Sequence, residues 1–453
     1  MRLGRERPDS WGRASCTLQP PMKELEPLSF DRALREAERE LERRKKTGEP
    51  TEDALPAWLT DEETLHWVRQ LRDKDPLAPS LELWLLRLRE QAEFGTRRAE
   101  LGRMYRAEPH PIAEPEQARR TLSELLHLSL ARPRERAAYL RGYFASSTAM
   151  AEQVLRLWEE RQLFAERLGA PLASFELASD AIAPAARAFL ARSRSAFDTL
   201  GVREPSGLLS ALLAEGASEG WPARLSQRTT LALLGDQSLV HGLRLRPFAV
   251  PQARGAGSFL LALGNAGRAL SDAASALRSP FVLSTDVFDL QRDTVGALLG
   301  ALPLSPAFAV RRLGLGPSRI RDQQRSLARA ALADLRVAAF RVLLRELLLS
   351  GKRLLLGELP ELSHGALGFE LPESTAGVFI RVRPRDDQRF AGALLAASRH
   401  ETLVQSHDED WFRNPRAIAE LRAELSEPAR APLSADALGD GAGHALSRIE
   451  ALF

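Results

Sequence analysis

Amphipathic helical periodicity runs through the chain from residue 28 onward and limits the folds open to it. Apolar residues recur at three- and four-residue steps in one segment after another, the pattern of helices that bury one face. Most of the 28 prolines fall between these segments, where a helix has to end. The sequence therefore predicts a mostly α fold. At most a small sheet is expected, from the strand-like segments at 238–252 and 376–384.

The periodic segments divide the chain into a tail and two helical regions. Residues 1–27 show almost no period and are predicted to be a disordered tail, with Met22 as an alternative start. Residues 28–150 form an N-terminal helical region and residues 151–453 a larger helical domain. We expect helices at 30–46, after the N-cap Ser29, and at 61–72, 80–104, 116–129, 133–144, 147–169, 178–200, 221–234, 259–277, 287–301, 317–350, 385–406, 409–424 and 443–452.

Charge and cysteine content exclude several classes of function. The 63 basic residues nearly balance the 60 acidic ones, a net charge of +3 that argues against a nucleic-acid partner. Cys16 is the only cysteine, so the chain has neither an internal disulfide nor a cysteine-based zinc site. No run of 18 apolar residues and no secretory apolar segment is present. We expect a cytoplasmic protein with no membrane partner.

The histidines do not form a recognisable metal motif. In "RHETLVQSHDED", His400 and Glu401 begin a sequence of the His-Glu-x-x-His kind, but the position of the second histidine is occupied by Val404. His407 lies seven residues from His400, about 10 Å along a helix, too far for both to bind one ion directly. A solvated helix face is the favoured interpretation, and a metal site at His400, Glu401 and Asp408 is the alternative. Serine-nucleophile, Walker A and dinucleotide motifs are also absent.

The helix predicted at 259–277 contains two weak helix formers side by side, Gly264 and Asn265. A glycine costs about 1 kcal/mol relative to alanine inside a helix. Two explanations are open, and they are compatible. Gly264 allows close packing against another helix, or both residues occupy positions that once carried a function.

Three segments resemble the helical zinc peptidases of the thimet oligopeptidase and oligoendopeptidase F type. "AERLGAPLASFELASD" (165–180) is similar to the turn before the catalytic region of that family, and "AGSFLLALGNAGRALSDAASALRSPF" is similar to its catalytic helix. "DEDWFRNPRAIAELRAEL" (408–425) resembles the C-terminal segment of bacterial members. The resemblance covers about residues 150–453 and implies a two-lobed helical fold with at most a small sheet bordering a central cleft.

The resemblance also implies that the zinc site has been lost. The two zinc-binding histidines of the family would fall on Gly264 and Arg268, its general base on Asn265, and its glutamate ligand near Asp293. One carboxylate cannot hold catalytic zinc, and a guanidinium stays positively charged where the metal would lie. We therefore expect no zinc and no other cofactor. Since Asp293 is the remaining acid, an ion pair between Arg268 and Asp293 is predicted.

The family also uses late tyrosine and histidine donors to stabilise the oxyanion, and such donors are a large part of catalysis. The three tyrosines here are Tyr105, Tyr139 and Tyr143, and Phe390 stands where an aromatic donor would be expected.

These changes predict a catalytically inactive, metallopeptidase-like protein, a pseudopeptidase. It would bind a peptide or a protein partner, such as an active relative, in or beside the ancestral cleft. The alternatives are an active hydrolase that uses non-standard residues and an unrelated helical scaffold. Arg381, Arg383 and His400 are candidate binding residues; the arginines of "FIRVRPRDDQRF" form either a surface for an anionic partner or a solvated basic edge.

Overall fold

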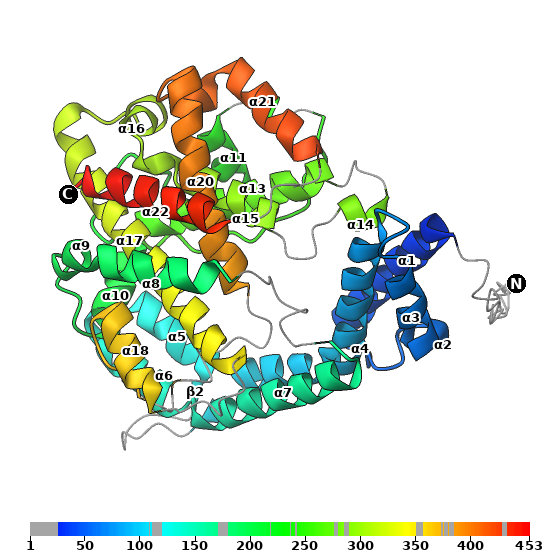
Figure 1. Cartoon of the computed structure of the whole chain (residues 1–453). Helices are drawn as coiled ribbons and strands as arrows, with labels where there is room; N and C mark the ends of the chain where they lie inside the picture. Colours follow the sequence, from blue (N-terminus) through cyan, green and yellow to red (C-terminus); the bar gives the residue numbers. More distant parts are fainter. Residues whose placement is uncertain are drawn as a thin grey trace, which may run out of the picture.

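The computed structural model describes residues 26–107, 109–110, 120–170, 180–217, 219–235, 237–240, 242–275, 280–284, 290–349, 357–372, 375, 379, 385–427 and 433–453. The N-terminal helices form a small lobe with a core of its own, on the right of Figure 1. It contains α1 (Pro27–Thr47), α2 (Ala57–Thr60), α3 (Glu62–Gln70) and the first part of α4 (Ala78–Ala107). Phe30, Leu34 and Trp84 are fully buried in its core.

The remaining helices form the larger body. They are α5 (Leu122–Ala131), η2 (Pro133–Glu135), α6 (Arg136–Ala145), α7 (Thr148–Arg167), α8 (Ile182–Arg192), α9 (Arg194–Asp198), α10 (Pro205–Leu213), α11 (Gln227–Leu234), α12 (Gln237–Val240), α13 (Ala256–Ser275), α15 (Leu290–Gly300), η4 (Leu302–Leu304), α16 (Pro306–Leu313), α17 (Pro317–Leu349), α18 (Glu358–Leu367), α20 (Asp386–His407), η6 (Trp411–Arg413), α21 (Pro415–Ser426) and α22 (Ala435–Glu450). The exception is α14 (Phe281–Ser284), which packs on α1 and α4 of the small lobe. Helices α4 and α7 pack together and run from the small lobe into this body (Figure 1).

The mostly α fold predicted from the sequence is confirmed. Within the described residues, the only sheet is an antiparallel pair of two-residue strands, β1 (Pro109–His110) and β2 (Arg120–Thr121). The prediction of strands at 238–252 is wrong, because this segment begins in α12 and continues from residue 243 as extended chain with no strand partner. Of the second proposed strand, 376–384, all but residue 379 lie outside the described residues.

Most predicted helices are present, and their ends shift where capping chemistry was misjudged. Helix α1 begins at Pro27 rather than after Ser29, since proline suits the first helical position. Helix α5 begins only after Thr121, whose side chain forms a capping box with Glu124. The helix predicted at 409–424 is split, because Asn414 caps a new helix that starts with Pro415.

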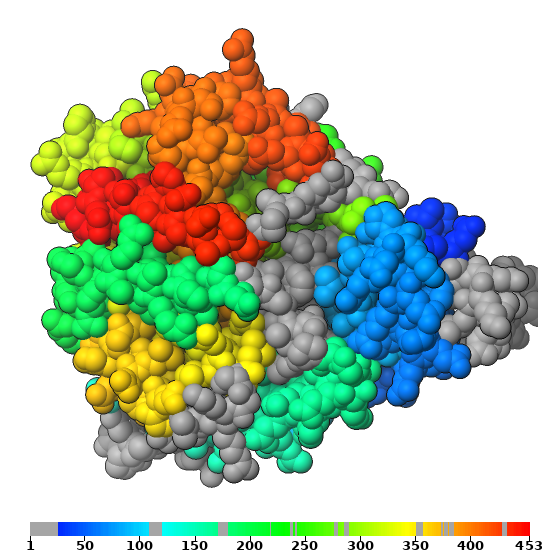
Figure 2. All heavy atoms as spheres, viewed as in Figure 1, coloured from blue at the N-terminus to red at the C-terminus, as the bar shows by residue number. Residues whose placement is uncertain are grey.

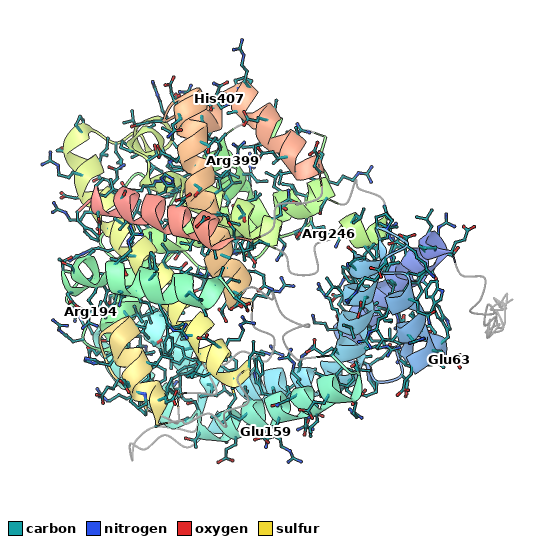
Figure 3. All side chains as sticks on the ribbon, viewed as in Figure 1. Glu63, Glu159, Arg194, Arg246, Arg399 and His407 are labelled. Carbon is teal, nitrogen blue, oxygen red and sulfur yellow. The ribbon has the colours of Figure 1, made fainter. Side chains whose placement is uncertain are left out.

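Three helices form a layered stack beside α13. Helix α15 packs between α13 and α20, and α20 packs in turn on α22. Figure 2 shows α22 on the surface between α20 and α8. On the outer part of α20, Arg399 and His407 both contact Glu420 of α21, at 2.7 Å and 2.9 Å (Figure 3).

Glycines bring α13 and α15 into backbone contact. A Cβ atom on Gly264 would lie 3.2 Å from the carbonyl oxygen of Gly296, and one on Gly267 would lie 2.7 Å from that of Val295. From the other side, a Cβ on Gly300 would lie 3.4 Å from the Cα of Gly264. These pairs show that the two helices run antiparallel. The packing explanation for Gly264 is therefore confirmed.

The connection between α13 and α15 is attached to the small lobe. It contains α14, whose first backbone N–H groups, those of Phe281 and Val282, each donate to a carboxylate oxygen of Asp31 at 2.8 Å. Asp31 belongs to α1 and is buried. A carboxylate at a helix N-terminus satisfies backbone donors that have no partner within the helix.

No single helix in the described part of the chain is both long and apolar enough to span a membrane. One pair, Leu290–Leu304 with Pro306–Leu313, meets the length and composition test only when taken together, and it is bent by 78°.

Replacing Gly267 by alanine should lower the free energy of unfolding by about 1–3 kcal/mol, because the new methyl group would force α13 and α15 apart. Gly439→Ala in α22 is the matched control. Gly439 is exposed with open space around it, so the substitution should raise stability by about 0.5–1 kcal/mol through helix propensity. Urea unfolding measures the change in the free energy of unfolding for both variants. Equal effects in the two variants would contradict the packing argument.

Candidate functional site

A groove of about 440 Å³ lies along α13 and α15. Its walls also include residues of α10, α17, α20, α22 and the extended chain before α13. On α13 the lining runs from Gly257 to Arg268, which corresponds to about 16 Å of helix. All three positions Gly264, Arg268 and Asp293 line this groove, while Asn265 lies next to it on α13.

Small residues form much of the groove surface, and leucines form most of the rest. The small residues leave open space between helices that are themselves in close contact. They are Gly257, Gly264, Gly296, Ala297, Gly300, Ala301, Ala330, Ala331, Ala393, Ala396, Ala397 and Ala445. The leucines are Leu130, Leu212, Leu213, Leu260, Leu261, Leu304 and Leu335. The result is a mostly apolar space that suits an apolar ligand body.

The ion pair predicted between Arg268 and Asp293 is confirmed. The Nε atom of Arg268 lies 2.6 Å from Oδ1 of Asp293. The Asp293 side chain is 6% exposed and that of Arg268 is 19% exposed. Glycine packing explains the geometry, because the Arg268 side chain crosses Gly296 on its way to Asp293, and a Cβ there would meet its Cγ at 2.8 Å.

Asn265 fixes both the arginine and the neighbouring chain. Its Oδ1 accepts a hydrogen bond from Nη1 of Arg268 at 3.0 Å, and its Nδ2 donates to the carbonyl oxygen of Ala249 at 2.8 Å. The same extended segment is held from α11, where Gln227 Nε2 donates to the carbonyl oxygen of Phe248 at 2.7 Å. Asn265 thus links the ion pair to the extended chain beside the groove.

A second ion pair lies in the groove wall. Nη2 of Arg389 on α20 donates to Oδ1 of Asp334 on α17 at 2.6 Å. The attraction of Asp334 raises the pKa of Arg389, and Asp293 acts in the same direction. Both acids of the described groove lining are therefore held by arginines.

These residues do not provide a zinc site. Gly264 has no side-chain atom that could bind a metal. Asn265 uses both ends of its amide in hydrogen bonds, and Asp293 is paired with Arg268. A catalytic zinc needs about three protein ligands. Among the described residues, no group of three or more His, Cys, Asp or Glu side chains is placed to hold a metal ion.

His400 belongs to the helical core rather than to the groove lining. It is buried in α20, and its Nδ1 accepts a hydrogen bond from Nε1 of Trp411 at 3.2 Å. Burial, and secondarily the positive charge of Arg448, lowers its pKa from 6.5 to about 3, so the ring is neutral. The alternative metal site at His400, Glu401 and Asp408 is not formed.

The other residues singled out in the sequence lie elsewhere. Arg381 and Arg383 fall outside the described residues. Phe390 is fully buried and packs edge-on against Phe189 in the core. Tyr139 and Tyr143 are buried in a separate cluster with Leu122 and Leu125, away from the groove lining. Sequence reasoning missed Arg254 and Arg448, and it placed Arg389 only among the arginines of "FIRVRPRDDQRF". The pattern along the chain gave no sign that these three residues would line one groove.

Comparison with known proteins gives a fold but no sequence family. No family profile and no curated protein matches the sequence. A solved oligoendopeptidase F aligns over 86% of this chain and 84% of its own, with 11% identity and a TM-score of 0.55. Metallocarboxypeptidase 1 of Trypanosoma cruzi aligns over 93% of this chain and 99% of its own, with 12% identity and a TM-score of 0.47. PZ peptidase A with an inhibitor aligns over 92% of this chain and 86% of its own, with 10% identity and a TM-score of 0.47.

The first of these matches shows that the chain has a peptidase-like helical fold, as the resemblance implied. The fold match and the groove do not fit a stack of helix pairs without a cleft.

Asp293→Asn should destabilise the protein by about 1.5–3 kcal/mol, because it leaves the half-buried Arg268 without its counter-charge. Asp198→Asn is the control. Asp198 pairs with Arg194 on the surface, where both side chains are about 40% exposed, and its loss should cost less than about 0.5 kcal/mol. Chemical denaturation measures the difference. A loss for Asp293→Asn no larger than that of the control would show that the ion pair contributes little.

Stability should fall as the pH drops below 6.5. The unfolded chain binds a proton at His400 below that pH, whereas the native state does so only near pH 3. This difference in proton binding lowers the free energy of unfolding by about 2 kcal/mol between pH 7 and pH 5. Denaturant unfolding of His400→Gln, which keeps a hydrogen-bond acceptor but does not titrate, should show a smaller loss over that range. An unchanged pH dependence would assign the loss to other groups.

Proposed function

We propose that this chain is a non-catalytic protein with a peptidase-like fold, a pseudopeptidase that binds a peptide or a segment of a partner protein in the groove along α13 and α15. The observation that carries the proposal is the Arg268–Asp293 ion pair at 2.6 Å. It lies at the contact of the two helices to which the resemblance assigns the metal ligands.

The side chains in the groove support inactivity. Hydrolysis of a peptide needs a group that activates water, and a group that stabilises the negative oxygen formed by its attack. The acids in the described lining, Asp293 and Asp334, both accept hydrogen bonds from arginines. The described lining contains no histidine, cysteine or tyrosine. A guanidinium cannot act as a base, since it stays protonated.

The shape of the groove supports binding. A length of about 16 Å accommodates about five residues of extended peptide. The leucine and alanine walls favour apolar side chains, and burying such side chains supplies most of the binding free energy in pockets of this kind. Helices on several sides make the groove preformed, which lowers the entropy cost of binding.

Peptidase assays on a mixed peptide library, with chelator-treated protein and with added zinc, test the inactivity. We expect no cleavage in either case. Zinc should also leave the melting temperature unchanged, because a metal stabilises the folded state only when that state binds it. Cleavage that depends on zinc, or a rise of several degrees, would contradict the proposal.

Ala297→Phe tests the binding site. The new ring projects from α15 into the groove and should weaken binding of a fluorescent apolar peptide, measured by anisotropy, by about tenfold or more. Ala191→Phe, on the exposed side of α8, is the control and should bind as the unmodified chain does. Equal affinity in all three proteins would place peptide binding outside the groove.

A further inference from the structure

Two arginines that form no ion pair with any acid in the described part of the chain mark one end of the groove. Arg448 of α22 donates from Nη2 to the carbonyl oxygen of Ala301, the residue after α15, at 2.8 Å. Arg254 lies two residues before α13, and its Nη2 donates to Oε1 of Gln252 at 2.5 Å. Because α13 and α15 are antiparallel, the start of α13 and the end of α15 lie at the same end. Neither arginine forms an ion pair with a described carboxylate.

From this arrangement we propose that the groove binds a monocarboxylate with an apolar body, its carboxylate held at the Arg254–Arg448 end and its body lying along the leucine and alanine walls. The inference rests on the proposed function, since it names the chemistry of the ligand for the same groove. The carboxylate can belong to a free fatty acid or to the C-terminus of an apolar peptide.

Arg448 provides the stronger argument. Burial lowers its pKa to about 10, against the attraction of Glu401, so the side chain remains positively charged at neutral pH. Arg448 is partly buried, and a charge withdrawn from water is costly unless a counter-charge and hydrogen bonds compensate it. Its guanidinium has five N–H donors, and the contact with Ala301 uses one. A carboxylate is the group that matches this fork of donors, and it can accept two of them at once.

The charges of the groove lining point the same way. The lining contains the arginines 254, 268, 389 and 448 and the aspartates 293 and 334, so four positive and two negative charges leave an excess of two. Asp293 and Asp334 neutralise the arginines at their own positions. The excess therefore belongs to Arg254 and Arg448. A ligand with a negative group at this end would balance it.

The walls argue for an apolar body. Leu261, one of the lining residues, is 45% exposed, and large apolar side chains with that exposure are few among the described residues. Along α13 and α15 the groove presents mainly glycines, alanines and leucines, together with helix backbone whose polar groups already bond within the helix. Ser258 and Gln252 are the uncharged polar side chains of the described lining, too few to pair with the many polar groups of a sugar or a nucleotide.

Isothermal titration with dodecanoate tests the inference on the full chain. We expect saturable binding, and weaker or no binding of dodecyltrimethylammonium, which has the same tail and the opposite charge. Arg448→Met should weaken dodecanoate binding about tenfold or more, since a charge-assisted contact is lost. Arg448→Lys keeps the positive charge but not the forked donors of the guanidinium. Its affinity for dodecanoate should lie between those of the unmodified chain and Arg448→Met. Arg103→Met, at an exposed position of α4, is the control and should bind normally.

The two sources of carboxylate are separated by an apolar pentapeptide tested as the free acid and as the C-terminal amide. If the free acid binds more tightly than the amide and this preference is lost in Arg448→Met, the Arg254–Arg448 end of the groove binds a peptide C-terminus. If only dodecanoate binds, this end binds a fatty acid.

If peptides bind equally as acid and amide and dodecanoate does not bind, the inference fails while the proposed function stands. If neither ligand binds, both fail. Should Arg448→Met not fold, Arg254→Gln replaces it, and an unchanged affinity in that variant would overturn the inference.

Discussion

The backbone contact between α13 and α15 determines the arrangement of the whole site. Gly264 and Gly267 on one helix meet Val295, Gly296 and Gly300 on the other, at separations that any larger side chain would increase. This contact sets the antiparallel register that brings Arg268 beside Asp293. It also leaves the small residues on the neighbouring faces exposed to a groove instead of filling it with side chains. Close packing and an open groove therefore have one cause, the small size of the residues along these two helices.

A charge pair at such a contact has a structural consequence beyond its own free energy. Asp293 is almost fully buried, and a buried carboxylate needs a counter-charge or several donors to offset the loss of its hydration. Arg268 supplies the charge, and Asn265 keeps the guanidinium in place while holding the extended chain at Ala249. Gly264 and Asn265, the two weak helix formers, thus each have a present role. A present role and an origin in a lost metal site are compatible, since a degenerating site is filled by whatever side chains the surrounding packing accepts.

In the described part of the chain, α14 links the small lobe to the two helices of the site. The chain that joins α13 to α15 passes through α14, and the Asp31 carboxylate of α1 binds the N-terminus of that short helix. A change in the position of the lobe would therefore act on both helices that line the groove. The proposed binding function would use this peptidase-like fold of two lobes and the groove along the two helices that the connection joins.

The sequence by itself determined the helices, the partnership of Arg268 with Asp293 and the absence of a recognisable catalytic motif. Helical periodicity and proline positions depend on neighbours in the chain, and they were sufficient for α13, α15, α17 and α20. The strands expected at 238–252 failed because alternating residues form a strand only when another segment supplies hydrogen-bond partners, and that is decided by the tertiary fold. The surroundings of His400, a core position beside Trp411, and the meeting of Arg254, Arg389 and Arg448 at one groove were likewise decided by helix packing. The three arginines are 59 to 194 positions apart in the chain. Their meeting depends on how helices cross, and the pattern within each helix carries no record of the crossing.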